Sequence, residues 1–454
     1  MIAGFDYGSS NCAVGVMDKG SVNLLSLWGG KKFIPSTLYA LDRGLICESV
    51  AHNIHSDSHR EEYINQRADA VRQASIIRSH LNISAQEQTL FVGEAAIENY
   101  IDFPEEGYFV KSPKSFLGAS GLRKEQMALF EDIVTAMMQS IKRQAELSLQ
   151  QPITKTVIGR PVNFQGSGGE ESNRQAVEIL TTSAKRAGYK DVEFLFEPLA
   201  AGIDFETDMQ QDQTVLVVDI GGGTTDCSVV RMGPSHRIKD DRTGDFLGHS
   251  GQRVGGNDLD INLSYKAFMP LLGLNSLLKN GLTIPSEPYW NAVRTNDVSA
   301  QTLFSSQKNT KFLEELCRDA RDSALVNRLL HIQEHKKNHQ LVRCGEQSKI
   351  ALSDNLQIEA VLAFIEKGLT QAVSRELFAE AIQGPLKTIS ALMREAVTQA
   401  QCSPDLVYVT GGTAKSPVIR EAIQQQLGDI PIMDGDHFGS VTSGLTKWAE
   451  KLFG

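Results

Sequence analysis

One sequence pattern occurs twice in this chain and constrains its fold more than any other feature. In the first copy the apolar stretch 2–5 leads into Asp6, a short polar turn with glycine, and a second apolar stretch. In the second copy another apolar stretch leads into Asp219, the glycines 221–223 and a further apolar stretch. Each copy predicts a β-hairpin with a tight turn. Because the copies lie roughly 210 residues apart, they indicate two related domains and not a solenoid of short repeats.

Strands and helices alternate along the rest of the chain. Between the two copies, the residue pattern predicts a helix over 131–150 and a buried strand at 156–158. Near the C-terminus it predicts a buried strand over 406–410, a tight turn at Gly411 and Gly412, and then another helix. This alternation is typical of an α/β architecture. The strand, glycine pair and helix also form a third junction of the kind that binds phosphate or a nucleoside.

The two hairpin turns combine a carboxylate with glycines and short hydroxyl residues. Such turns let backbone N–H groups and hydroxyls surround phosphate oxygens. Mg²⁺ prefers few carboxylates together with water and substrate phosphates, so Asp6 and Asp219 would suffice to hold it through water. An Asp-Gly turn is also common in purely structural hairpins, but two copies and a third glycine junction favour a functional role. The residues predicted to surround the phosphates are Gly8, Ser9, Ser10, Asn11, Gly221, Gly222, Gly223, Thr224 and Thr225.

The sequence disfavours two alternative roles for the glycines and several classes of partner. It contains neither G-x-x-x-x-G-K-[ST] nor G-x-G-x-x-G, which argues against a P-loop and a dinucleotide fold. The 45 basic and 55 acidic residues give a net charge of −10, which argues against nucleic acid or an anionic membrane as a partner. The six cysteines form no C-x-x-C pair, and the N-terminus shows no signal-peptide pattern. We therefore expect a cytoplasmic protein that binds its anionic ligand locally.

Further short motifs lie along the chain. They are the segments 91–96, 114–118, 197–201, 254–260, 346–349, 374–378 and 411–417. Together with the two turns, they resemble the nucleotide-binding domain of the Hsp70 chaperone family, within the superfamily of actins, sugar kinases and Hsp70 proteins. Actins and sugar kinases share the phosphate loops but are not expected to carry the helix motifs. The resemblance spans most of the chain and favours the chaperone branch.

The resemblance implies a fold and a domain organisation. The expected fold is α/β, with duplicated ribonuclease H-like domains that form a two-lobed actin-like ATPase with a nucleotide cleft. Lobe I would comprise residues 1–211, with 434–454 returning to it. Lobe II would comprise 212–433, including a helical subdomain at about 256–380. The implied cofactors are ATP or ADP and Mg²⁺.

The resemblance also implies roles for individual residues. Lys114 would neutralise charge on the γ-phosphoryl group and help to place the attacking water. Glu197 and Asp219 would orient that water or accept its proton, while Asp6 and Asp219 hold metal-bound waters. The other cofactor-binding residues implied are Gly255, Gly256, Glu346, Lys349, Ser353, Gly411, Gly412, Thr413 and Lys415.

The chain departs from the family pattern at several places. Ile350 and Lys415 stand where the family often presents arginine to stack on adenine, so we expect weaker or differently tuned base binding. The spacers 39–93 and 256–346 are longer than is usual in the family, and the loop 434–439 matches only loosely.

We therefore expect a slow ATPase whose lobe rotation signals to a protein partner or client. The sequence ends at Gly454, before the apolar linker and peptide-binding domain of a full Hsp70 protein, so this switch would lack its own peptide clamp. An actin-like filament-forming ATPase and a small-molecule kinase of the sugar type are the alternatives, and fold similarity alone does not choose among them.

Overall fold

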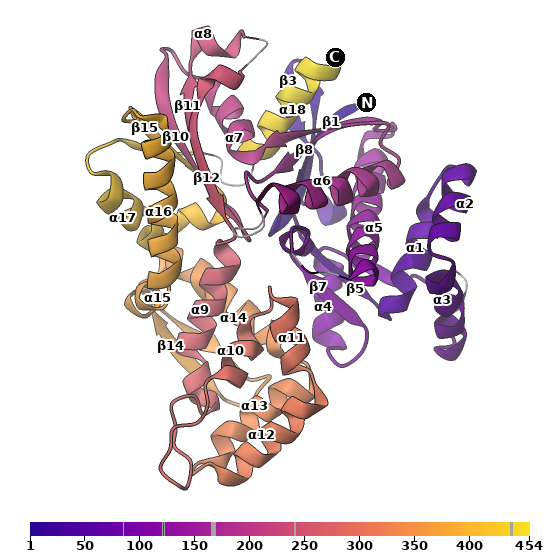
Figure 1. Cartoon of the computed structure of the whole chain (residues 1–454), viewed down its shortest axis with the longest axis vertical. Coiled ribbons are helices and arrows are strands. Elements are labelled where there is room, and N and C mark those ends of the chain that lie inside the picture. The colour runs from indigo at the N-terminus through magenta and orange to yellow at the C-terminus, as the bar shows by residue number, and fades with distance from the viewer. Residues whose placement is uncertain (85, 120, 122, 165–168, 240–241, 436–438) are drawn as a thin grey trace. The chain divides into compact units, whose positions relative to one another are not determined.

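The computed structural model describes residues 1–84, 86–119, 121, 123–164, 169–239, 242–435 and 439–454 (Figure 1). The chain has a mixed α/β fold and divides into two compact units. Unit 1 comprises Met1–Arg253, Ala391–Ala414 and Leu427–Gly454, and unit 2 comprises Val254–Ser390 and Lys415–Gln426. The lobe boundaries expected from the sequence stay a prediction. No helix in the described ranges is long and apolar enough to cross a membrane.

Two sheets of unit 1 share one topology. In each, a first strand pairs antiparallel with a second and parallel with a strand from much later in the chain. The first sheet has the order β3 (Ser21–Leu24), β2 (Asn11–Asp18), β1 (Ile2–Tyr7), β8 (Lys155–Arg160) and β9 (Asp191–Phe196), and β4 (Ile34–Pro35) also pairs with β2. The second has the order β12 (Phe246–Gln252), β11 (Thr225–Met232), β10 (Gln213–Ile220), β15 (Leu406–Thr410) and β16 (Ile432–Asp434). The strand directions also correspond from sheet to sheet.

The predicted hairpins and alternation are confirmed. β1 and β2 pair up to Tyr7 and Cys12, and β10 and β11 pair up to Ile220 and Thr225, so each predicted turn connects two paired strands. The central strand β10 is buried along most of its length, which explains its nearly continuous apolar sequence. The predicted elements correspond to α5 (Lys124–Leu149), which begins before the expected residue 131, and to β8, β15 and the helix α17 (Pro417–Leu427). The helix α6 (Gly169–Arg186) lies between β8 and β9.

The last helix, α18 (Ser440–Phe453), packs against β1, β2, β8 and α7 (Glu197–Glu206). Two glycines allow this close approach. A Cβ on Gly444 would overlap the carbonyl of Ala200, and a Cβ on Gly4 would overlap the backbone of Thr446. The preceding loop was expected to match the family only loosely, and its residues 436–438 lie outside the described residues.

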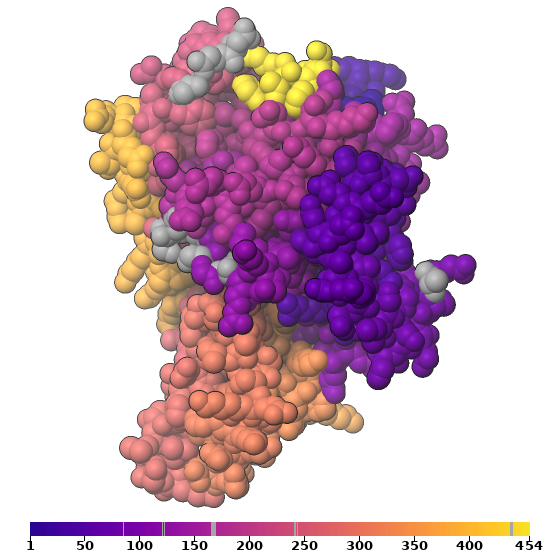
Figure 2. Space-filling model, turned by 45° about the vertical axis from the view of Figure 1, so that its right-hand side comes forward, coloured from indigo at the N-terminus to yellow at the C-terminus, as the bar shows by residue number. Residues whose placement is uncertain are grey.

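The long spacer 39–93 contributes to a small sheet and forms a group of helices within unit 1. The sheet has the order β6 (Leu90–Val92), β5 (Thr37–Ala40) and β7 (Tyr108–Lys111). The helix α4 (Glu94–Asp102) packs against one face of this sheet. The helices are α1 (Ile46–Asn53), α2 (Asp57–Gln66) and α3 (Ala68–His80). Apolar residues of α1 and α5 belong to one core cluster. Figure 2 shows this early part of the chain, in indigo, on the surface of the molecule.

Unit 2 is mainly helical. Pro288 lies in the first turn of a helix, α10, where its missing N–H costs nothing. Its α-helices are α9 (Gly256–Ala267), α10 (Glu287–Val293), α11 (Val298–Phe304), α12 (Gln307–Asp319), α13 (Ser323–Glu334), α14 (Asn338–Asp354), α15 (Arg375–Ala381), the first part of α16 (Gln383–Ala400) and nearly all of α17 (Pro417–Leu427). A hairpin of β13 (Gln357–Val361) and β14 (Thr370–Ser374) lies between α14 and α15.

Candidate functional site

The turns of the two predicted hairpins lie in contact with each other in unit 1. A Cβ on Gly222 would overlap the hydroxyl oxygen of Ser10. A Cβ on Gly223 would lie 3.1 Å from Ser9 Oγ and 2.5 Å from Ser115 Oγ. The turns can approach this closely only because glycine lacks a Cβ. Two segments far apart in sequence thus place backbone N–H groups and hydroxyls around one location.

A buried ion pair lies beside these turns. Lys114, in the 3₁₀ turn η3 (Pro113–Phe116), pairs through Nζ with Glu197 Oε1 and donates to the carbonyl oxygen of Gly159 at 3.0 Å. Its side chain is only 3% exposed. Because water cannot solvate this ammonium, its charge must be balanced by protein carboxylates or by a bound anion. Glu197 is the first residue of α7, and Pro198 is the second.

Four carboxylates surround this single ammonium closely enough to affect one another. Burial raises the pKa of Asp6 to about 7, and repulsion from Glu197 adds to the shift. Burial, reinforced by Glu197, raises the pKa of Asp226 to about 8. The pKa of Asp219 lies well above its ordinary value because of burial and the charges of Glu197, Asp226 and Asp6. Clusters of buried groups with shifted pKa values are typical of functional sites.

A cluster of buried carboxyl groups suits a hydrated divalent cation, which would favour their ionised forms. One oxygen of Asp226, Oδ2, is buried and finds no hydrogen-bond partner within the described part of the chain. Thr442 of α18 donates to Asp6 Oδ2 at 3.5 Å, which orients that carboxylate. Within the described ranges, no three His, Cys, Asp or Glu residues could hold a metal directly. Two turn aspartates beside backbone N–H groups and hydroxyls fit Mg²⁺, which prefers few carboxylates and keeps several of its waters.

The predicted residues fall into two groups, one in each unit. In unit 1, Gly8, Ser9 and Ser10 form the first turn and Asn11 begins β2. The second turn contains Gly221, Gly222, Gly223 and Thr224, with Thr225 beginning β11; Gly411 follows β15, and Gly412 and Thr413 begin η6 (Gly412–Lys415). Gly411 has φ +88°, and a Cβ there would lie 3.0 Å from Asp219 Oδ1. Unit 1 thus brings both turns, the glycine junction, Lys114 and Glu197 together.

The second group lies in unit 2. Gly255 and Gly256 form the start of α9, and Glu346, Lys349 and Ser353 lie on α14, while Lys415 ends η6. Lys349 links the two helices, since its Nζ pairs with Asp260 Oδ1 at 2.7 Å and donates to Gly256 O at 3.3 Å. Ile350 is 60% exposed on the same helix.

Sequence reasoning missed Asp226 as a site residue, although a signal was present. In the β10–β11 hairpin Asp219 lies directly opposite Asp226, and opposed residues of an antiparallel pair share one face of the sheet. The spacing of the hairpin could therefore have indicated a carboxylate pair. Thr442 had no such signal, because its contact with Asp6 joins the two ends of the chain.

Comparison with known proteins shows a similarity to one family. Residues 116–264 match the family model described as Hsp70 protein. The chaperone protein dnaK3 of Thermosynechococcus vestitus is 23% identical over 442 residues, which cover 95% of this chain and 52% of that protein. The chaperone protein dnaK of Emiliania huxleyi is 22% identical over 441 residues, which cover 95% of this chain and 56% of that protein. The chain is similar to Hsp70 proteins and spans about half the length of the curated relatives it matches.

Proposed function

We propose that this protein is a slow ATPase of the Hsp70 type that works as a nucleotide-dependent switch. The observation that carries the proposal is the contact of two aspartate-bearing hairpin turns beside the buried Lys114–Glu197 pair. Backbone N–H groups of residues 8–11 and 221–225 would bind the phosphates of ATP or ADP from two sides. The shared topology of the two sheets supports duplicated ribonuclease H-like halves. In this proposal the halves belong to lobe I (1–211 and 434–454) and lobe II (212–433).

The buried ion pair would serve hydrolysis. The Lys114 ammonium would stabilise negative charge that develops on the γ-phosphoryl oxygens. Glu197 and Asp219 would orient the attacking water and accept its proton, a role to which the raised pKa of Asp219 is suited. Asp6 and Asp219 would hold Mg²⁺ through water, and the ion would neutralise phosphate charge. Asp226, opposite Asp219, would complete this carboxylate group.

The remaining residues named from the sequence are proposed to bind the adenosine part. Lys349 is held at the start of α9 by Asp260 and the Gly256 carbonyl, which supports a shared binding role for α9 and α14. The aliphatic Ile350 would replace planar stacking by arginine, so we expect modest affinity for the base. The residues proposed for this part are Gly255, Gly256, Glu346, Lys349, Ser353, Gly411, Gly412, Thr413 and Lys415.

The comparisons favour the switch over the other two functions. Both relatives named above are chaperones, whereas a filament subunit or a sugar-type kinase would be expected to match other members of the superfamily. We propose that a protein partner or client senses the nucleotide state in the cytoplasm. ATP hydrolysis without any acceptor would separate this function from that of a kinase.

The proposal is tested by single-turnover hydrolysis of prebound ATP by the parent and by Lys114→Ala. Loss of a preorganised positive charge should slow hydrolysis by about 100-fold or more. Lys124→Ala removes an exposed lysine at the start of α5 and serves as the matched control, with an unchanged rate. If Lys114→Ala hydrolyses ATP within about twofold of the parent rate, Lys114 has no catalytic role.

A further inference from the structure

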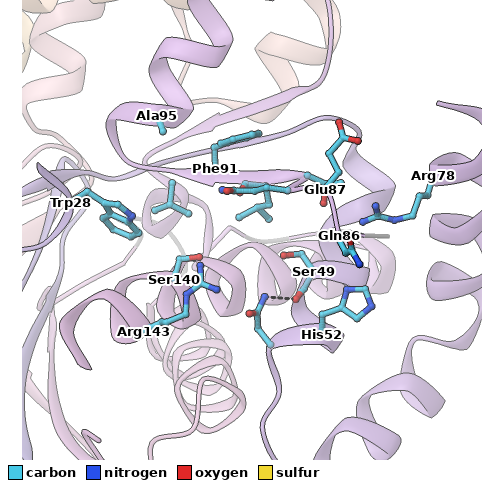
Figure 3. Close-up of a pocket in the computed structure, with 15 residues that line it drawn as sticks. Trp28, Ser49, His52, Arg78, Gln86, Glu87, Phe91, Ala95, Ser140 and Arg143 are labelled. Atoms are coloured by element: carbon cyan, nitrogen blue, oxygen red, sulfur yellow. Dashed lines mark hydrogen bonds between the residues drawn. The ribbon is translucent and has the colours of Figure 1, made fainter. Parts of the chain in front are cut away.

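A second site lies in unit 1, apart from the residues proposed to bind nucleotide. It is a pocket of about 350 Å³, within the size range of pockets that bind small ligands. Its walls come from α1, α3, β6, α4 and α5, together with Trp28 (Figure 3). Its lining is mostly polar and includes Arg78 and Arg143.

The pocket borders the edge of a β-strand and not one of its faces. β6 is an edge strand of its three-stranded sheet. The side chains of Leu90 and Val92 pack into the main core of unit 1, whereas Phe91 packs with Tyr39 on the opposite face. All three residues of the strand nevertheless line the pocket. Residues from both faces can line one cavity only where it opens along the strand edge.

The backbone N–H and C=O groups of β6 that point away from β5 face the pocket. Leu41 N–H donates to Thr89 O and Gly93 N–H donates to Thr37 O, both at 3.0 Å, so residues 89, 91 and 93 bond to β5. In an antiparallel pair the intervening residues direct their N–H and C=O groups away from the partner strand. Leu90 and Val92 are those residues. One side chain already bonds to this edge, since Gln88 Nε2 donates to Leu90 O at 2.8 Å.

Arg143 is the group of the pocket that favours an acidic side chain of an occupant; the lining carboxylate Glu87 accepts the Ser84 N–H at 3.3 Å. The Arg78 guanidinium is already neutralised, because its Nε donates to both carboxylate oxygens of Glu48 at 3.0 and 3.1 Å. Arg143 is exposed and makes no ion pair with any residue that the structure describes. Guanidinium and carboxylate form strong charge-assisted hydrogen bonds.

We propose that this pocket binds an extended acidic peptide segment of a partner protein. The segment adds a strand to β6 by main-chain hydrogen bonds at Leu90 and Val92, and it displaces the Gln88 amide from Leu90 O. One of its carboxylates pairs with Arg143. A small anion alone would bind the Arg143 guanidinium but not the strand edge. Whether binding depends on the main-chain amides of the ligand therefore distinguishes a peptide from a small anion.

The first test measures peptide binding by fluorescence anisotropy. The probe is a rhodamine-labelled Thr-Glu-Val-Glu-Val peptide, and Thr-Lys-Val-Lys-Val is the charge control. We expect the acidic peptide to bind the parent and to bind Arg143→Glu at least about tenfold more weakly. Arg174→Glu, which reverses an exposed arginine of α6 outside the pocket, should bind like the parent. Equal binding by Arg143→Glu and the parent, or no binding by the parent, would overturn the proposal.

The second test asks whether the main chain is used. Gln88→Ala frees Leu90 O and should tighten binding by about threefold, an increase that a misfolded variant would not produce. The same peptide with N-methylated backbone amides should lose binding. Hydrogen exchange at the amides of Leu90 and Val92 should slow when the unmodified peptide binds. If the methylated peptide binds as well as the unmodified one, no strand is added and the proposal is wrong. The proposal is also wrong if inorganic phosphate binds at this pocket and its binding alone explains the effect of Arg143→Glu.

Discussion

Among single residues, Asp226 shows most clearly how burial and charge act together. Its Oδ1 accepts the Val162 N–H at 2.7 Å, while its Oδ2 is buried without a hydrogen-bond partner in the described ranges. Burial and the nearby Glu197 raise its pKa to about 8. Without ligand, this carboxyl group therefore retains a proton at neutral pH. A cation bound nearby would favour its ionised form.

The raised pKa predicts how stability depends on pH. In the unfolded chain the pKa of Asp226 returns to about 3.8, so the folded state binds the proton more tightly. The stability contributed by this proton is complete below about pH 4 and is lost as the pH rises through about 8. Asp226→Asn stays neutral at every pH. Without nucleotide and magnesium, its melting temperature should exceed that of the parent by more than about 4 °C at pH 8.

The measurement is a series of thermal melts between pH 5 and pH 8. The difference between Asp226→Asn and the parent should grow steadily across this range. Asp18→Asn, a change of an exposed carboxylate at the end of β2, should show no such trend. A constant difference for Asp226→Asn would contradict the raised pKa.

Among elements, the two hairpin turns are the pair whose contact matters most. Gly222→Ala would push a methyl group into Ser10, and it should weaken nucleotide binding by about tenfold or more. Ser10→Gly removes the atoms nearest that methyl group, so the double variant should bind better than the two single effects combined would predict. Calorimetric titration of ADP with Mg²⁺ measures this coupling.

The control for this cycle is a glycine without close neighbours. Gly384, at the start of α16, has nothing within 4 Å of an added Cβ, so Gly384→Ala should bind nucleotide like the parent. Additive effects of the Gly222 and Ser10 variants would show that the two turns act independently.

The helices of the spacer 39–93 are attached to α5 and α6 by a buried charge cluster. Arg67, just before α3, pairs with Asp132 at 3.1 Å and with Glu131 at 3.0 Å, and Arg186 pairs with Glu131 as well. Asp132→Ala would leave Arg67 partly unpaired and should reduce the free energy of unfolding by about 3–5 kcal/mol in chemical denaturation. Asp69→Ala removes an exposed ion pair with Arg72 and should cost less than about 1 kcal/mol. Similar costs for both variants would contradict a stabilising role of the cluster.

Local sequence predicted the elements that have an apolar signature and missed those that lack one. The helix predicted after Gly411 and Gly412 is α17, which its buried residues and Pro417 mark clearly. By contrast, α2 buries only Tyr63 of its 10 residues, so it has no apolar stripe that a pattern could reveal. The pattern placed the start of α5 near residue 131, although the helix begins at Lys124. The pattern missed the first turn because that turn is mostly polar.

At the scale of the whole molecule, the candidate site depends on contacts that no local pattern contains. Spacing alone gives no reason to distinguish Lys114 from a surface lysine, and only the resemblance to Hsp70 proteins indicated its role. The structure buries Lys114 against Glu197, 83 positions away in sequence. The two aspartates of the turns were predictable because the hairpin pattern is repeated. The helix α18, which supplies Thr442, reaches Asp6 only through the fold.

The central claim is that two related hairpin turns bind one nucleotide together. Calorimetric titration with ADP and Mg²⁺ tests it most directly, because it reports both the stoichiometry and the affinity. We predict one nucleotide per chain, with affinity reduced both by Ser10→Ala in the first turn and by Gly222→Ala in the second. Two nucleotides per chain, or an affinity that a change in either turn leaves intact, would contradict the claim.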